Sequence, residues 1–213
     1  MRISPGHMVT LLVLTLITGV ISGCKDKKAA PQPATMEKPQ GQPVAETDRG
    51  RRTIQVFKAY QKDVVGSLKA ALTGGGTVAA ITVCKEVAAG LKERFRDMPE
   101  VTVRRVAQRY RNADHVPDAF ETAIFKEWED GMAEGTPPIA IARATEAGLR
   151  VMQPIMLGSR LCLRCHGKPR DMTSETVETL QRLYPNDNAT NFEMGDLRGA
   201  FSAIWHQAPA ATP

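Results

Sequence analysis

The residues best suited to chemistry form the run Cys162-Leu163-Arg164-Cys165-His166, a C-x-x-C-H pattern. This pattern is typical of covalent attachment of c-type haem. Two thiols one helical turn apart can add to two vinyl groups on one edge of a porphyrin, and the imidazole beside them can bind the iron. The motif therefore predicts one covalently bound haem c, with Cys162 and Cys165 as attachment residues and His166 as the proximal axial ligand.

Two other uses of paired cysteines fit the sequence less well. A redox-active C-x-x-C pair belongs to a thioredoxin-like βαβ unit, and the residues around Cys162 show no such pattern. A structural zinc site needs a second ligand pair at similar spacing, which the remaining cysteines do not provide. Haem attachment is therefore the preferred interpretation.

The motif does not identify the ligand on the opposite side of the iron. Histidine, methionine, cysteine thiolate and tyrosinate all bind haem iron. Cys84 lies on the apolar stripe of an amphipathic segment, so we expect its side chain to face inward, either as a ligand or as a small buried hydrophobe. The other available side chains are His115, His206, Met152, Met156 and Met194.

The N-terminus has the pattern of a bacterial lipoprotein signal. Arg2 precedes an apolar run over residues 8–20, and small residues come directly before Cys24. The run is shorter than the roughly 20 residues that span a bilayer, but it suits a signal peptide over residues 1–23. We expect cleavage before Cys24 and lipidation of its thiol; the alternative is an uncleaved anchor. Either predicts an extracytoplasmic (periplasmic) protein tethered to a bacterial membrane, where c-type haem is attached.

The composition indicates one folded domain with unstructured ends. Residues 24–50 hold four prolines without apolar periodicity and are predicted to form a flexible tether. Residues 51–207 form the predicted domain, and residues 208–213 a disordered tail. Of the 213 residues, 42% are hydrophobic and 24% charged, as in ordinary globular proteins. The net charge of +5 is not arranged as a basic stripe interleaved with aromatics, so we expect no nucleic-acid partner.

Within the predicted domain, apolar spacing indicates helices followed by mixed strands and helices. A first helix should end at the glycines of residues 74–76, and Pro117 should lie in the first turn of a helix that Gly131 closes. The pattern predicts helices over 54–72, 78–91, 117–131, 161–166 and 174–183, and strands near 101–103, within 139–156 around Glu146-Ala147-Gly148, and over 197–205. This order favours an α+β fold with an antiparallel sheet flanked by N-terminal helices.

Across residues 53–205 the domain resembles a family of single-haem c-type proteins with a PAS-like sensor fold, found alone or as the extracytoplasmic part of bacterial signalling proteins. The resemblance is carried, in order, by residues 80–84, 103–106, 111–112, 117–121, 153–155, 162–167, 184–189 and 195–200. It implies a PAS-like sheet and one covalent haem. The positions of Ala113 and His115 depart from the family pattern, so His115 could lie near the haem.

The resemblance also implies roles for residues outside the motif. It makes Cys84 the preferred distal axial ligand, opposite His166. Arg104, Arg105 and Arg111 become the cations expected beside the haem propionates, because guanidinium pairs well with carboxylate; a solvated strand face is the alternative. A thiolate ligand predicts a low-potential iron.

Three functions follow from these expectations. The first is a redox- or gas-responsive sensor module, in which Cys84 leaves the iron on reduction and a signalling partner receives the signal. The second is a simple low-potential electron-transfer cytochrome with a redox partner protein. The third, less favoured, is a haem peroxidase, for which His115 is the available acid/base residue.

Overall fold

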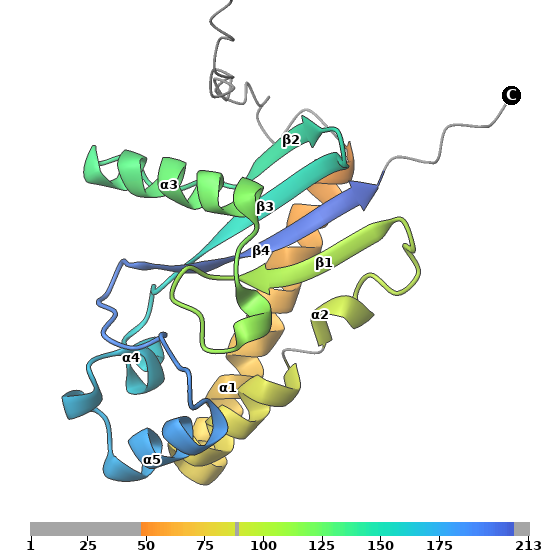
Figure 1. Ribbon diagram of the computed structural model, residues 1–213. Helices are drawn as coiled ribbons and strands as arrows, with labels where there is room; N and C mark the ends of the chain where they lie inside the picture. The colour runs from red at the N-terminus through yellow and green to blue at the C-terminus, as the bar shows by residue number, and fades with distance from the viewer. Residues whose placement is uncertain (1–47, 88–89, 207–213) are drawn as a thin grey trace, which may run out of the picture. The chain divides into compact units, whose positions relative to one another are not determined.

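A long helix and a shorter one cover opposite faces of a four-stranded sheet (Figure 1). The computed structural model describes residues 48–87 and 90–206. In chain order the elements are α1 (Asp48–Val87), α2 (Gly90–Glu93), β1 (Val101–Val106), the 3-10 turn η2 (Ala113–His115), α3 (Ala119–Ala133), β2 (Ile141–Thr145), β3 (Gly148–Met156), α4 (Arg160–His166), the 3-10 turn η3 (Pro169–Asp171), α5 (Ser174–Leu183) and β4 (Leu197–His206).

The sheet has the strand order β1-β4-β3-β2, and each neighbouring pair is antiparallel. Strands β2 and β3 form a hairpin, whereas β4 comes last in the sequence and lies between β1 and β3. A register shift between Ile155 and Met156 interrupts the pairing of β3 with β4 near the start of β4. The expected α+β fold with an antiparallel sheet is confirmed.

Successive side chains along each strand point to opposite faces of the sheet, so the core is divided into one cluster under α1 and one under α3. On the α1 face, the Phe57 ring stacks on Phe201 at 5.3 Å between centroids, and Tyr60 meets Phe201 edge-on at 5.7 Å. On the α3 face, Met152 is buried with Phe125 and Trp128. Burial of each such side chain contributes about 1.5–3 kcal/mol, so both helices are held mainly by apolar contacts.

A conformational break divides α1 into two stretches. Gly76 has φ 70° and ψ −163°, a combination open to glycine alone. The glycines of residues 74–76 therefore bend α1, whereas the sequence predicted that they would end it. Beyond the break, the Thr77 and Thr176 hydroxyls hydrogen bond and join α1 to α5. α1 is long and apolar enough over Asp48–Lys85 to cross a membrane by length and composition, a test that core helices of soluble proteins also pass.

The other predicted elements are present with small shifts at their ends. Asp118 caps α3 in a reciprocal capping box with Glu121, so Pro117 lies before the helix and not in its first turn; α3 continues past Gly131 to Ala133. Residues 48–50, predicted as tether, already belong to α1. The predicted signal peptide over 1–23, Cys24, the rest of the tether and the tail over 208–213 lie outside the described residues.

Candidate functional site

Helix α4 presents the C-x-x-C-H motif. The Ser159 hydroxyl caps the helix by accepting a hydrogen bond from the Leu161 N–H at 3.2 Å. Gly167 ends it, and a Cβ at this position would lie 2.6 Å from the Leu163 carbonyl oxygen. Because residues three and four apart share a helix face, Cys162, Cys165 and His166 present their side chains on neighbouring positions of one short helix. Both thiols are free and half-buried.

The His166 ring is fixed in one tautomer. Its Nδ1 lies 2.8 Å from the Ala189 carbonyl oxygen, which only accepts, so Nδ1 carries the proton. Phe192 meets the imidazole edge-on, at 6.1 Å between ring centroids. Burial lowers the pKa of His166 well below its ordinary value, and Arg198 and Arg111 lower it further. The neutral ring therefore keeps its Nε2 lone pair for a metal, as ligating histidines do.

Arg111 ties the motif to the segment that follows α5. Its Nε donates to an Asp187 carboxylate oxygen at 2.9 Å, and its Nη2 donates to the carbonyls of Cys165 at 2.5 Å and Ala189 at 3.3 Å. The other Asp187 oxygen accepts from the Ala189 N–H at 2.7 Å. The Arg111 guanidinium also lies 5.8 Å from the Tyr184 ring centroid. Arg111 and Asp187 thus hold both the Cys165 backbone and the carbonyl that orients His166.

Cys84 lies on the second stretch of α1, which contacts both α4 and α5. Its side chain is half-buried, as expected for an inward-facing position. Burial raises the pKa of the Cys84 thiol, Arg105 and Arg111 oppose this effect, and Cys162 adds to it. The charge of Cys84 in turn raises the pKa of the Cys165 thiol, after the larger effect of burial. The fold therefore brings Cys84 close to both motif cysteines.

Among the other candidate ligands, His115 shares charged neighbours with His166. Burial, then Arg105 and Arg198, lower its pKa to about 4; Arg105 and Arg198 also act on His166. His206 lies at the end of β4 farthest from Leu197, where its Nε2 meets the Thr102 hydroxyl at 2.8 Å. Met152 is fully buried on the α3 face.

The two remaining methionines are less enclosed. Met156, at the end of β3, is half-buried, and Met194 is 46% exposed. Of the candidate ligands in the described residues, Cys84 acts electrostatically on the motif cysteines, and His115 shares the neighbouring charges Arg105 and Arg198 with His166. The identity of the distal ligand stays a prediction.

The three arginines expected beside propionates have different surroundings. Arg104 donates to the Val116 carbonyl and pairs with the buried Glu121 carboxylate at 3.2 Å. Arg111 has the partners given above. Arg105 makes no hydrogen bond or ion pair in the described part of the chain, and its charge acts on Cys84, His115 and His166. Propionate contacts stay a prediction, for which Arg105 has the most available guanidinium.

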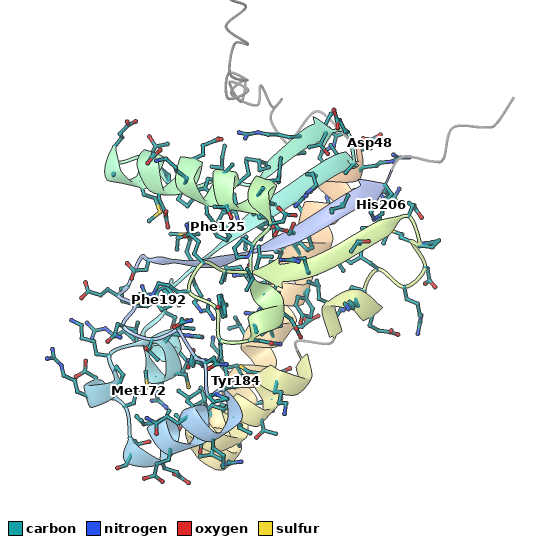
Figure 2. All side chains as sticks on the ribbon, in the orientation of Figure 1. Asp48, Phe125, Met172, Tyr184, Phe192 and His206 are labelled. Atoms are coloured by element: carbon teal, nitrogen blue, oxygen red, sulfur yellow. The ribbon has the colours of Figure 1, made fainter. Side chains whose placement is uncertain are left out.

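Sequence reasoning gave no role to Arg198 or to the 187–189 segment. Arg198 is 9% exposed and has the first charge effect on His166 after burial. The sequence offered two signals: both segments belong to the stretches that carry the family resemblance, and Arg198 is a charged residue in an otherwise apolar predicted strand. Phe192 and Tyr184 lie at the end of the sheet that carries α4 and α5 (Figure 2). Within the described ranges, no three His, Cys, Asp or Glu side chains are grouped so as to hold a metal ion by themselves.

Comparison with known proteins gives two matches. The model of the family described as Tll0287-like matches residues 40–205. A crystal structure described as that of the cyanobacterial heme-protein Tll0287 aligns with a TM-score of 0.63 and 23% identity, covering 78% of this chain and 99% of that one. A search of curated proteins found no match. At this identity, the structural likeness shows a shared fold.

Proposed function

Because this chain belongs to the Tll0287-like family, we propose that it binds one haem as covalent haem c. The structurally similar Tll0287 is described as a heme-protein. The observation that carries the proposal is the set of side chains on α4: two free thiols beside a neutral imidazole whose Nδ1 is held by Ala189. Cys162 and Cys165 would each hold the haem through a C–S bond to one vinyl group, with the thiol proton passing to the neighbouring carbon.

When bound, the haem supplies one-electron chemistry at its iron and a site for a diatomic gas. His166 provides the proximal nitrogen, and its fixed tautomer aims Nε2 away from Ala189. Arg111 and Asp187 keep the backbone of the motif in place. Arg105 supplies an unpaired cation for a propionate.

The further proposal is a redox- or gas-responsive sensor in which Cys84 is the distal ligand. Arg105 and Arg111 favour the Cys84 thiolate, while burial favours the neutral thiol. Reduction by one electron from a partner protein removes one positive charge from the site. Because burial already has the larger effect on the pKa of this thiol, Cys84 would hold the distal position as a thiolate only while the site carries enough positive charge, and after reduction it would be free to bind a proton from solvent.

A simple electron carrier is the second candidate. The observation in its favour is the fixing of His166 and Cys165 by Ala189 and Arg111, because a motif that moves little lowers the reorganisation that accompanies electron transfer. Either function fits the proposed export, periplasmic location and lipid anchor at Cys24, which rest on the sequence of residues 1–24. Labelling with a radioactive fatty acid, lost in Cys24→Ser, tests the anchor.

Mass spectrometry tests the haem assignment. The full chain, produced in cells able to mature c-type cytochromes, should keep one haem mass after denaturation. The double variant Cys162→Ser/Cys165→Ser should lose it, whereas the matched variant Cys84→Ser should keep it. Retention of covalent haem by the double variant would contradict the proposed attachment.

Binding of CO separates the two functions. In the sensor, the ferrous protein binds CO at a rate set by departure of Cys84, and the ferric protein keeps its six-coordinate spectrum. In the carrier, both oxidation states keep both ligands, and CO does not bind. Absence of CO binding would therefore remove the sensor proposal and leave the haem assignment intact.

A further inference from the structure

Arg198 is a buried guanidinium that lacks an anionic partner. It is the second residue of β4 and is 9% exposed. Its Nη1 donates to the Arg109 carbonyl oxygen at 3.1 Å, and its Nε, also buried, has no hydrogen-bond partner. Within residues 48–87 and 90–206, no carboxylate forms an ion pair with it. A buried charge in this condition is costly, because it has lost its water and gained no counter-charge.

The charges around Arg198 increase that cost. Arg105, Arg111 and Arg109 all repel it, and the charge of Asp187 opposes them. Asp187 is already paired with Arg111. Burial, with these neighbouring cations, lowers the pKa of Arg198 to about 9. This local excess of positive charge would be balanced by an anion, which the residues that the structure describes do not supply.

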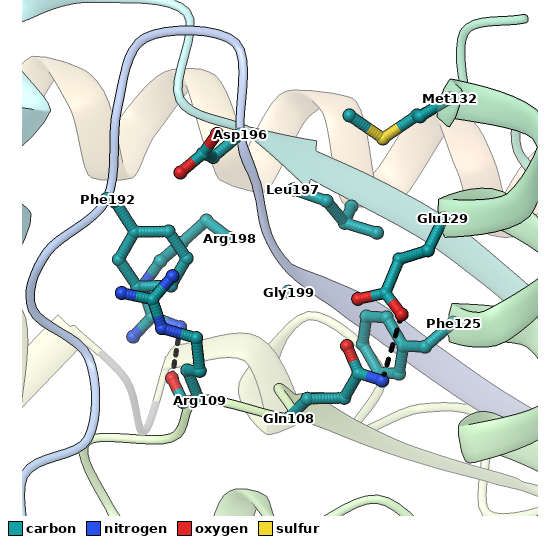
Figure 3. Close-up of a pocket in the computed structure, with 10 residues that line it drawn as sticks. All are labelled: Gln108, Arg109, Phe125, Glu129, Met132, Phe192, Asp196, Leu197, Arg198 and Gly199. Carbon is teal, nitrogen blue, oxygen red and sulfur yellow. Dashed lines mark hydrogen bonds between the residues drawn. The ribbon is translucent and has the colours of Figure 1, made fainter. Parts of the chain in front are cut away.

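A cavity of about 310 Å³ lies beside Arg198, and Figure 3 shows its walls. Arg109 and Gln108 contribute further donors, and the Arg109 guanidinium lies 3.6 Å from the Phe192 ring centroid, with that of Arg198 at 5.4 Å. The remaining walls are mostly apolar, from Phe125, Met132, Leu197 and Gly199.

Two carboxylates also reach the cavity, and both have partners. Asp196 accepts from the Glu193 N–H at 2.8 Å, and Glu129 accepts from the Gln108 amide at 3.4 Å. Neither pairs with Arg198. Figure 3 shows the Gln108 amide against Glu129 on one side of the cavity and the Arg109 and Arg198 guanidiniums beside Phe192 on the other.

We propose that this cavity binds a carboxylate group, with Arg198 as its principal cation and Arg109 as a second. Two sources offer that chemistry: a small free dicarboxylate, or a propionate of the haem. The propionate source rests on the proposed function above; the free acid does not. The Phe192 ring lines the cavity and is edge-on to His166. The charge of Arg198 acts on His166, so an anion bound to Arg198 changes the electrostatics at that imidazole.

Titration calorimetry and spectroscopy on the full chain test the proposal and tell the sources apart. Haem content is measured first by the pyridine haemochrome method, so failure of the haem assignment is detected separately. Succinate is then titrated into the haem-loaded and haem-free protein at constant ionic strength. The variants are Arg198→Met, which removes the charge, Arg198→Lys, which keeps it, and Arg182→Gln, an exposed control on α5.

If a free dicarboxylate is the occupant, the haem-loaded protein binds succinate saturably. Arg198→Met then weakens binding about tenfold or more, as loss of a charge-assisted hydrogen bond should. Arg198→Lys keeps measurable binding, and Arg182→Gln matches the wild type. If a propionate is the occupant, succinate binds the haem-free protein only, and Arg198→Met shifts the propionate bending band in resonance Raman spectra and lowers the reduction potential.

The proposal is overturned if succinate binds neither form and Arg198→Met leaves the propionate band and the potential unchanged. In that case Arg198 is an uncompensated charge, and Arg198→Met should withstand urea better than the wild type. If Arg198→Met does not fold, titration of succinate into the wild type and Arg198→Lys still decides whether the cavity binds a carboxylate.

Discussion

His166 and Arg111 donate hydrogen bonds to the same carbonyl oxygen, that of Ala189, at 2.8 Å and 3.3 Å. The imidazole and the guanidinium come from segments far apart in the sequence, and the shared acceptor holds them side by side. Because Arg111 also binds the Cys165 carbonyl, one side chain contacts both the backbone of α4 and the acceptor that orients the His166 ring.

Removing the ion pair between Arg111 and Asp187 should destabilise the fold. The Arg111 and Asp187 side chains are 13% and 9% exposed, so deleting either leaves a nearly buried charge alone. We expect Arg111→Ala to lower the free energy of unfolding by about 3 kcal/mol in urea denaturation, and Arg111→Ala/Asp187→Ala to cost less than the sum of the single variants. Arg170→Ala, at an exposed ion pair with Asp171, should change it by less than about 1 kcal/mol. If Arg111→Ala and Arg170→Ala lowered the free energy of unfolding equally, the buried Arg111–Asp187 ion pair would not be the important contact.

Cys84→Ser should change the electronic spectra of the ferric protein. A thiolate ligand gives low-spin EPR and absorption features that a serine hydroxyl does not reproduce. We expect these features to vanish in Cys84→Ser and to remain in the matched variant His115→Gln. The reverse pattern would make His115 the distal ligand. No change in either variant would point to a methionine or an open position.

The break in α1 should distinguish two glycine substitutions. Gly76 has φ 70°, so Gly76→Ala should destabilise the protein by about 1–3 kcal/mol. Gly66 lies within regular helix with no heavy atom within 4 Å of a built Cβ, so Gly66→Ala should stabilise it by about 0.5–1 kcal/mol. Urea denaturation of both variants measures the difference. If Gly76→Ala were neutral, α1 would not need the break that lies between its two stretches.

Acid should destabilise the fold partly through His115. Its pKa falls from 6.5 to about 4 on folding, through burial and the cations Arg105, Arg198 and Arg104, with Asp114 acting in the opposite sense. Between these values the unfolded chain binds more protons than the folded one, so stability is lost as the pH falls from about 6.5 to about 4. His115→Gln should flatten the dependence of unfolding free energy on pH in this window. If the slope in His115→Gln equalled that of the wild type, protonation of His115 would not be the cause of the acid destabilisation.

Local patterns were sufficient to predict most elements. The spacing of apolar residues located α5, β1 and β4, and the motif itself predicted the short helix α4. The glycines of residues 74–76 were misjudged because composition does not distinguish a bend from an end: Thr77 meets Thr176 on α5, and that distant contact lets the helix continue beyond the break.

The site was predictable only where its residues are consecutive. The C-x-x-C-H spacing of Cys162, Cys165 and His166 by itself indicated a haem-binding role. Asp187, Ala189 and Arg198 lie in segments that carry the family resemblance, but their contacts form only where these segments meet in the folded chain, so the sequence did not predict their individual roles. Arg104 was expected beside a propionate, but in the fold it pairs with Glu121 of the α3 capping box, a partner that its own sequence neighbourhood does not indicate.

The central position of β4 imposes an order of events during synthesis. The strand that pairs with both β1 and β3 is also the last of the described strands to leave the ribosome. Until it arrives, β1 has no neighbour in the sheet. Cys162 and Cys165 precede β4 in the chain, so both thiols are synthesised before β4 can enter between its two neighbours and close the sheet.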